Sequence, residues 1–339
     1  MKYLLTLLSI GLSLSLSAQK SKIHTSAELL KIAVDSKLSY SVSIMEKPIP
    51  PENYEDKLVM PDYYRVHEGE SIIVKKYNIN AKAKAMFESA EADFQANKFT
   101  EAREKYLMAY ADDTTLSLAL TYAGQVAEHS ANYVDAESLL KRSVRQNYAD
   151  YMAHWFLANV YEHNGVIKKA KEEILIAHIL NRNNPRIISA LKRIILKEGF
   201  SYHDDWQFNP QIMVQKTDSG INVQYGGIWL GYALARAIWQ FEPGYRESMG
   251  VAKDADLSYN QDREKEGLLG VLVAAKSDAG KKLPKDVLAL QSATEKGMFQ
   301  EYLFYEIWLP KRPEIALQLP AKFIDEIGTY ILKVRCSTN

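Results

Sequence analysis

The sequence has very little cysteine and no excess of charge of either sign. Its one cysteine, Cys336, cannot form a disulfide within the chain, so side-chain packing must hold the fold together. No cysteine directly follows the N-terminal apolar segment, and we therefore expect no lipoprotein anchor. The 42 Lys and Arg residues balance the 42 Asp and Glu residues, which leaves no net field to attract nucleic acid or an anionic membrane. A nucleic-acid partner is therefore disfavoured.

Long apolar runs are also missing. The N-terminal apolar run, residues 3–16, is shorter than the ~20 residues that a membrane-spanning helix needs. Lys2 precedes this run and the small residues Ser17 and Ala18 end it, a pattern typical of a secretory signal peptide over residues 1–18. We expect cleavage after Ala18 and no stable membrane insertion afterwards, with a retained anchor as the alternative. The ending "SLSAQK" resembles export signals of Bacteroidota-type bacteria, which implies a periplasmic or secreted location.

Signatures of catalysis are absent as well. The sequence contains no phosphate-binding glycine loop, dinucleotide fingerprint, paired-histidine zinc helix or nucleophile-elbow serine. Two polar clusters remain: His203 precedes Asp204 and Asp205, and Glu242 and Arg246 flank a turn. Aspartates before a helix or strand are typically caps, and a Glu–Arg pair across a turn is typically a surface salt bridge. We therefore assign no catalytic residue and expect no cofactor.

What the sequence does contain is an internal repeat. The motifs "FTEA", "YVDA" and "IKKA" end in Ala102, Ala136 and Ala170, which are equally spaced. Each alanine has a small residue twelve positions before it, a large residue four positions after it and a small residue seven positions after it. These positions hold Ala90, Gly124 and Ala158, then Tyr106, Leu140 and Ile174, and then Ala109, Ser143 and Ala177. Such spacing lets two helices cross closely while the large side chains fill the gaps between units.

This spacing of about 34 residues and the pattern within it resemble the tetratricopeptide repeat, a helix-turn-helix unit of that length. The resemblance covers residues 83–199 as three units, 83–116, 117–150 and 151–184, followed by a capping helix over 185–197. It implies a solenoid in which neighbouring units bury what one unit cannot. The usual turn glycine is present as Gly165 but replaced by Asn97 and Ala131.

In this family the first helices of the units line a concave groove that binds the ligand. The corresponding positions here are Phe87, Glu91, Phe94, Gln95, Thr121, Gln125, Glu128, His129, Met152, Trp155, Asn159, Glu162 and His163. Aromatic, amide and acidic side chains dominate this set, so the resemblance implies a protein or peptide partner with basic or apolar side chains. The Lys, Arg and Asn set with which some related repeats grip a C-terminal carboxylate is missing, and we expect no such clamp.

Two Glu-His pairs in the groove raise the question of a metal site. Glu128 with His129 and Glu162 with His163 recur at the repeat period. Equivalent positions on stacked helices lie roughly 8–10 Å apart, whereas ligand nitrogens lie about 2 Å from a shared metal. We therefore expect solvated groove side chains and no metal.

The segments that flank the repeats are less regular. Within residues 19–82, the stretch 25–42 begins with a Thr-Ser cap signal and predicts a helix. Residues 46–69 contain four prolines and several tyrosines, which predicts an irregular segment on the surface of the repeats or in their groove. Residues 200–339 predict a mainly helical C-terminal domain. It contains a β-hairpin around the turn 217–220, and helices over 229–241, 262–276, 285–309 with a break near Gly297, and 321–334.

The predicted fold is therefore mainly α: a solenoid of three tetratricopeptide-like repeats with a capping helix, then a helical domain with a small hairpin. The function that this fold favours is an exported scaffold that binds a peptide or protein through the concave face. Two alternatives stay open. One is an enzyme with its site in the C-terminal domain, and the other is a carbohydrate-binding accessory of the cell envelope, which rests on the tyrosines and tryptophans.

Overall fold

The computed structural model describes residues 23–69, 71–277 and 282–338 of the chain. The predicted signal peptide, residues 1–18, lies outside these described residues. Among the helices that the structure describes, none is both long enough and apolar enough to cross a membrane.

The described chain forms two compact units, each built from segments that are far apart in the sequence. Unit 1 contains residues 54–203 and 307–338, and unit 2 contains residues 23–53 and 204–306. The sequence predicts a contiguous C-terminal domain that begins at residue 200. The structure instead groups the last residues of the chain with the repeats, and residues 23–53 with the other unit.

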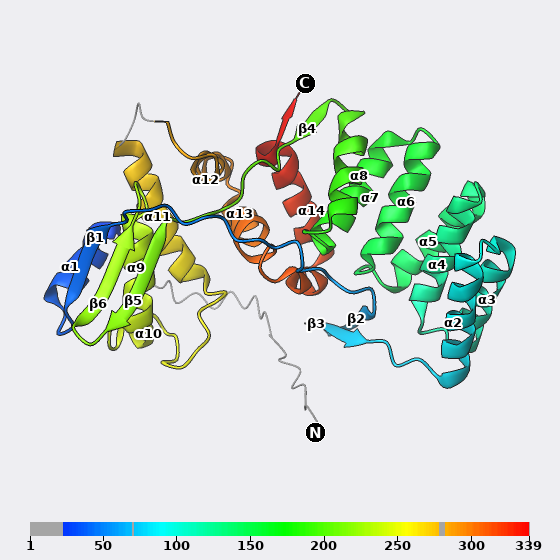
Figure 1. Ribbon diagram of the computed structural model, residues 1–339, viewed down its shortest axis with the longest axis horizontal. Helices are drawn as coiled ribbons and strands as arrows, with labels where there is room; N and C mark the ends of the chain where they lie inside the picture. Colours follow the sequence, from blue (N-terminus) through cyan, green and yellow to red (C-terminus); the bar gives the residue numbers. More distant parts are fainter. Residues whose placement is uncertain (1–22, 70, 278–281, 339) are drawn as a thin grey trace. The chain divides into compact units, whose positions relative to one another are not determined.

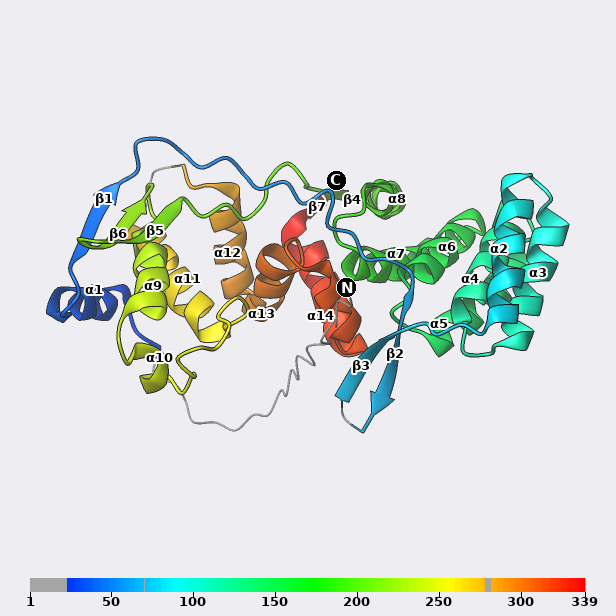
Figure 2. The ribbon, with the colours of Figure 1, turned by 60° about the horizontal axis from the view of Figure 1, so that its bottom comes forward.

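Unit 1 contains the repeats as three successive helical hairpins and one further helix (Figures 1 and 2). The second helix of each hairpin begins one full period after that of the hairpin before it, as the repeat predicts. The fold class is thereby confirmed as mainly α with tetratricopeptide-type hairpins. The helices are α2 (Ala81–Gln95), α3 (Phe99–Asp112), α4 (Ser117–His129), α5 (Tyr133–Gln146), α6 (Tyr151–His163), α7 (Ile167–Leu180) and α8 (Pro185–Leu196).

The small repeat positions lie where the helices of a hairpin cross. Ala102, Ala136 and Ala170 have no exposed surface, and Gly124 is buried. A Cβ atom on Gly124 would lie 2.7 Å from the Cγ atom of Leu140, so α4 and α5 approach too closely for a larger residue. The large residue Tyr106 is fully buried between units, which explains why it accompanies the alanines.

The turn inside each hairpin uses a left-handed backbone at one fixed repeat position. Asn97 has a φ of 57°, Ala131 a φ of 59° and Gly165 a φ of 74°. Left-handed φ values favour glycine because a Cβ atom crowds the following carbonyl oxygen. The same turn therefore forms in all three units, although two of them lack the glycine that suits it.

A β-hairpin in unit 1 corrects the expectation that residues 46–69 are irregular throughout. Strands β2 (Tyr63–Glu68) and β3 (Ser71–Lys76) pair antiparallel, with Gly69 in the turn at a φ of 63°. The alternation of Val66 with polar neighbours in β2, followed by the β-branched run in β3, favours these strands. The prolines that predict irregular structure all precede the hairpin.

Two equivalent asparagines tie this N-terminal segment to the repeats. Asn147 and Asn181, at the same position of successive repeats, are the C-caps of α5 and α7. The Asn181 side chain accepts from the Val59 backbone N–H (3.0 Å) and donates to the Val59 carbonyl (3.1 Å). Asn147 donates to the carbonyl of Tyr63 (3.0 Å). The segment thus runs along the C-terminal ends of the second helices.

The C-terminal residues complete unit 1. The buried Arg65 guanidinium of β2 donates to the Leu319 carbonyl (2.7 Å), which joins the hairpin to this part of the chain. Strand β4 pairs antiparallel with β7 next to the last helix. The elements are β4 (Phe200–Tyr202), the 3-10 helix η2 (Pro313–Gln318), α14 (Ala321–Tyr330), the π-helical turn η3 (Ile331–Arg335) and β7 (Cys336–Thr338).

Unit 2 is a three-stranded sheet packed against helices (Figure 1). The predicted hairpin is present as β5 and β6, and β1 adds to β6 in parallel, which gives the order β1-β6-β5. The apolar residues Ile221 and Val223 of β6 pack on Ala233 and Ala237 of the following helix. The elements are α1 (Ser26–Asp35), β1 (Tyr40–Ile44), β5 (Ile212–Thr217), β6 (Gly220–Tyr225), α9 (Leu230–Phe241), α10 (Tyr245–Ser248), α11 (Gln261–Ser277), α12 (Lys285–Glu295), α13 (Phe299–Tyr302) and the π-helical η1 (Leu303–Trp308), which continues into unit 1.

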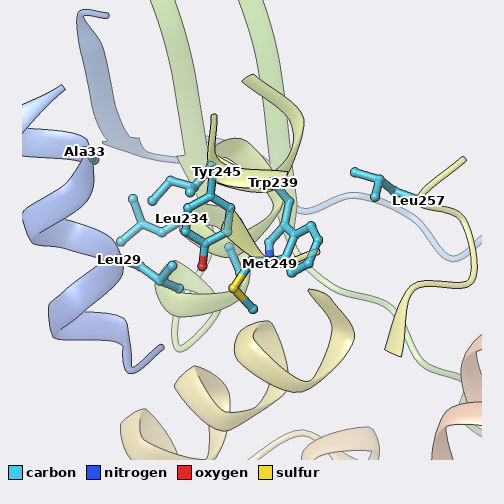
Figure 3. Close-up of a cluster of buried hydrophobic side chains, with 9 residues drawn as sticks. Leu29, Ala33, Leu234, Trp239, Tyr245, Met249 and Leu257 are labelled. Carbon is cyan, nitrogen blue, oxygen red and sulfur yellow. The ribbon is translucent and has the colours of Figure 1, made fainter. Parts of the chain in front are cut away.

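A buried carboxylate ties the N-terminal residues into the core of unit 2. Glu266 of α11 has no exposed surface and accepts hydrogen bonds from Trp239 Nε1 (2.6 Å), the Tyr245 hydroxyl (2.8 Å) and the His24 backbone N–H (2.8 Å). Figure 3 shows the apolar cluster to which Trp239 and Tyr245 belong, with Leu29 of α1 directed toward Tyr245. The helix predicted from the Thr-Ser cap signal is thus held by both apolar and polar contacts. It is shorter than predicted, because α1 ends at Asp35 and β1 follows.

Candidate partner-binding groove

An open cavity of about 540 Å³ lies on the first helices of the repeats. It collects side chains from the second and third units and from the capping helix α8. Its lining residues are Glu128, Tyr133, Asn159, Glu162, His163, Arg193 and Lys197. Four of these, Glu128, Asn159, Glu162 and His163, belong to the groove predicted from the sequence.

Glu162 in this cavity is already neutralised by cations of α8. Its carboxylate forms an ion pair with Arg193 and lies 2.7 Å from the Nζ atom of Lys197. Arg193 also donates to the side-chain oxygen of Asn159 (3.2 Å). Glu162 is buried, so this pairing offsets part of the cost of placing its charge there. Glu162 therefore organises the cavity and offers little charge to a partner.

Glu128 differs from Glu162 because no cation of the described chain is paired with it. Within the described residues, its carboxylate takes part in no hydrogen bond or ion pair. Partial burial raises the pKa of Glu128, an effect that the charges of His129 and Arg193 oppose. A cation that enters the cavity would therefore stabilise the ionised form of this half-buried carboxylate.

The two histidines of the Glu-His pairs contact aromatic rings, His163 by stacking and His129 edge to face. His163 lies parallel to Tyr133, with ring centroids 3.7 Å apart, and His129 packs against Phe99 at 4.6 Å. In each case the ring partner is the first residue of the second helix in the preceding hairpin. Among the described residues, no group of three His, Cys, Asp or Glu side chains is placed to share a metal ion.

The first unit contributes its aromatic residues mainly to packing. Phe87 contacts the rings of Tyr106 and Tyr122, each at a centroid distance of 5.1 Å. Phe94 packs against Phe99 at 5.7 Å. Both phenylalanines are half-buried in the clusters between units, so they support the groove and present only part of their surface.

Other groove positions of the first and second units differ in their access to solvent. Gln95 is exposed and Gln125 is half-buried. Glu91 is half-buried and accepts a hydrogen bond from the Tyr106 hydroxyl, so its carboxylate already has a partner. This leaves Glu128 as the groove carboxylate with the clearest access to a new cation.

Thr121 corrects the predicted groove, because its side chain has no exposed surface. Its hydroxyl donates to the Asp150 carboxylate and lies 2.6 Å from the Ser143 hydroxyl. Asp150 in turn accepts from the backbone N–H of Met152 (3.0 Å) and caps α6. Burial raises the pKa of Asp150, against the effect of these hydrogen bonds. Thr121 is therefore a structural residue that a partner cannot reach in this structure.

Met152 and Trp155, the other predicted groove residues of the third unit, do not line this cavity. Both side chains are half-buried. Trp155 stacks on the next residue, Phe156, with ring centroids 5.4 Å apart and planes 16° from parallel. Trp155 thus keeps part of its ring exposed, as suits an aromatic contact residue.

Arg193 and Lys197 line the cavity although neither belongs to the predicted set. They lie on or directly after α8, which the sequence predicts only as a cap. Carrying the groove positions of the repeat one more period along the sequence would have predicted both residues. Arg193 lies one period after Asn159, and Lys197 lies one period after His163. The helix that closes the array therefore supplies the cations of its groove.

The polar residues singled out in the C-terminal region do not form one site, because each of them makes its own structural contact. The His203 ring lies 3.1 Å from the Ser337 hydroxyl, and Asp205 forms an ion pair with Lys285. Glu242 accepts from the hydroxyls of Ser36 (2.7 Å) and Tyr40 (2.9 Å). Arg246 instead donates to backbone carbonyls, including that of Trp239.

A second cavity, of about 700 Å³, lies in unit 2. Trp206 and Trp229 form part of its wall, together with the carboxylates of Asp205 and Asp286. Burial raises the pKa of Asp286, whose carboxylate accepts the Asn209 backbone N–H at 3.2 Å. Aromatic and polar groups thus share this cavity.

Among known proteins, the matches are to solved structures. No protein-family model matches the sequence, and no curated protein is a match. The repeats are similar to the first tetratricopeptide domain of Spaghetti (RPAP3) bound to the HSP90 peptide SRMEEVD, with 19% identity over 35% of this chain and 96% of that one (TM-score 0.34). The Arabidopsis OM64 tetratricopeptide domain is similar at 16% identity over 34% and 96% (TM-score 0.33). The Yersinia enterocolitica type III secretion translocator chaperone SycD is similar at 17% identity over 35% and 96% (TM-score 0.33).

Proposed function

We propose that the protein is an exported scaffold that binds a peptide segment of a partner protein in the groove of its repeats. The observation that carries this proposal is the cavity where Glu128, Asn159, Glu162 and His163 meet Arg193 and Lys197. Concave sites with a few fixed polar groups and rigid aromatic neighbours suit a peptide side chain and its backbone.

The segment that fits this cavity carries an arginine. Glu128 is a half-buried carboxylate without an ion pair in the described chain, so an incoming guanidinium would compensate its charge. The stacked rings of Tyr133 and His163 line the same cavity, and a planar guanidinium packs on an aromatic face better than an ammonium does. Half-buried Trp155 offers apolar area further along the groove.

Binding of the purified protein to an array of short peptides tests this function. The array varies one central residue among Arg, Lys, Gln and Glu between apolar neighbours. We expect selection of Arg, and we expect Glu128→Gln to weaken binding of the Arg peptides by about tenfold, which corresponds to 1.4 kcal/mol. Glu88→Gln is the matched control, because Glu88 is an exposed glutamate on α2.

Two results would contradict the proposal. One is equal binding of Arg and Glu peptides, and the other is unchanged binding by the Glu128→Gln variant. A photoreactive residue at exposed His163 gives a second test in the native cell, with exposed Met108 on α3 as the control position. Crosslinks of one partner from position 163 but not from position 108 support binding in the groove.

Export rests on residues 1–18, whose sequence is typical of a signal peptide. We propose a periplasmic or secreted location after cleavage at Ala18. Cell fractionation followed by N-terminal sequencing of the mature protein tests this. A cytoplasmic protein that keeps Met1 or Lys2 would contradict it.

The cavity of unit 2 favours a second candidate function, the binding of a carbohydrate. Trp206 and Trp229 lie in its wall beside Asp205 and Asp286, and aromatic faces with nearby polar acceptors suit a sugar ring and its hydroxyls. Glycan-array binding by the protein and by its Trp206→Ala variant tests this candidate. The absence of any glycan signal with the wild-type protein would end it.

A further inference from the structure

The sheet of unit 2 has an outer strand without the usual protection of an edge. Strand β1 is hydrogen-bonded to β6 on one side, and no other described strand pairs with it. Its sequence, Tyr40-Ser41-Val42-Ser43-Ile44, contains no charged residue and no proline. Natural edge strands commonly carry lysine, proline or a bulge that prevents pairing with another chain. The opposite edge strand, β5, carries Lys216.

The free backbone groups of β1 can be assigned from its bonds to β6. The Ser39 carbonyl accepts from Ile221 N–H (2.7 Å), and Met45 N–H donates to the Tyr225 carbonyl (2.8 Å). Backbone groups alternate between the two sides of a strand, so odd-numbered residues of β1 bond to β6. The N–H and carbonyl groups of Tyr40, Val42 and Ile44 therefore point away from the sheet.

The same residues also leave apolar surface at the edge. Val42 is 41% exposed and Ile44 70% exposed. The register pairs Val42 with Val223 and Ile44 with Tyr225, so these side chains point to the face of the sheet that packs on α9. Ser41 and Ser43 point to the opposite face, where an open polar cavity of about 350 Å³ lies over the sheet. The edge thus has one apolar side and one hydroxyl side.

The sequence of β1 is nearly the same when read in either direction. If a second β1 pairs antiparallel with the first around Val42, Val42 meets Val42, Tyr40 meets Ile44, and Ser41 meets Ser43. Apolar groups then face apolar groups and hydroxyls face hydroxyls, which are favourable cross-strand pairs. The outward backbone groups of Val42 would bond to those of its equivalent, as in a hydrogen-bonded antiparallel pair.

From this self-complementary edge we propose that two copies of the protein associate through β1 about a twofold axis at Val42, so that their three-stranded sheets form one continuous sheet. A twofold axis is the commonest symmetry of soluble homo-oligomers, and it requires a surface that complements itself. The occupant of the edge is a second copy and not a foreign strand, because β1 paired with its own reversed sequence places apolar residues opposite apolar residues and serines opposite serines.

Analytical ultracentrifugation of the purified protein over a range of concentrations tests the proposal. We expect a monomer–dimer equilibrium for the wild-type protein. Val42→Lys should shift this protein to a monomer, because two like charges then lie directly opposite each other. Val273→Lys is the matched control in the same unit, since Val273 is a 61% exposed valine of α11, and it should dimerise like the wild type.

Charge complementation makes the test specific for the axis at Val42. Val42→Lys and Val42→Asp variants should each be monomeric, whereas their equimolar mixture should form a heterodimer. Circular dichroism of each variant checks that unit 2 remains folded. A wild-type protein that stays monomeric at every concentration overturns the proposal, as does a dimer that Val42→Lys leaves unchanged. Isolation of the native protein with another chain bound at β1 also overturns it.

Discussion

Ala131 adopts the same left-handed turn conformation as Gly165, its equivalent one repeat later. Their φ values are 59° and 74°, and both residues follow the first helix of their hairpin. The repeat therefore imposes this backbone on alanine, for which it is unfavourable by roughly 1–2 kcal/mol. The relationship gives two opposite predictions for stability.

Ala131→Gly should stabilise unit 1 by about 1 kcal/mol, because glycine relieves the left-handed strain at some cost in chain entropy. Gly165→Ala should destabilise it by a similar amount. A Cβ atom at Gly165 would meet no heavy atom within 4 Å, so the effect there is conformational and not steric. Urea denaturation measures both, and equal stability of the two variants would contradict the strain argument.

Gly124→Ala should destabilise unit 1 by about 1–3 kcal/mol, because the added Cβ would lie 2.7 Å from Leu140 Cγ inside a packed hairpin. Leu140→Ala removes the atoms in conflict but leaves a cavity. In the double variant, the total cost should therefore be less than the sum of the two single costs. Denaturation of the four proteins in this cycle provides the measurement, and simple additivity would refute the contact.

His178 should make the stability of unit 1 sensitive to acid. Burial, with the nearby charges of Arg182 and Arg335, lowers the pKa of His178 well below the ordinary value of 6.5. Below about pH 6.5, His178 of the unfolded chain binds a proton, whereas His178 of the folded chain stays neutral until a lower pH. The free energy of unfolding therefore falls as the pH falls below about 6.5. The slope from this residue approaches about 1.4 kcal/mol per pH unit.

The His178→Leu variant should lose less stability than the wild type between about pH 7.5 and pH 5.5. Thermal melting at the two pH values measures this difference. His67→Gln is the control, since His67 is exposed on β2 and should leave the acid sensitivity unchanged. Equal acid sensitivity of His178→Leu and the wild type would contradict the assignment.

Glu266 should control how firmly the N-terminal helix is held in unit 2. Glu266→Gln keeps the size of the side chain but weakens its bonds with Trp239 and Tyr245, at a cost of about 1–3 kcal/mol. Hydrogen exchange should then quicken in α1, because the His24 backbone loses a charged acceptor. Exposed Glu247→Gln is the control, and unchanged exchange in α1 would contradict this role.

Much of unit 1 could be predicted from the sequence, because its pattern is periodic. Ala102, Ala136 and Ala170 repeat the same local requirement for a close helix crossing, and every hairpin satisfies it in the same way. The β5–β6 hairpin was equally predictable, since its strands are adjacent and its turn is short. Groove positions such as His163 follow from the same register and lie in the cavity.

Only the tertiary structure decided the features that depend on contacts between distant parts of the chain, namely burial, ion pairing and strand pairing. The periodic pattern gave Thr121 the same place as Trp155, but only the packing of α5 and Asp150 buries Thr121. Likewise, Glu162 and Glu128 occupy equivalent positions in the repeat, but Arg193 and Lys197 form ion pairs with Glu162 and not with Glu128. Strand β1 pairs with β6 although all of the repeats lie between them in the sequence, so no local pattern predicts that pairing. Local spacing determined the hairpins, whereas burial and charge pairing between segments selected the residues that remain available to a partner.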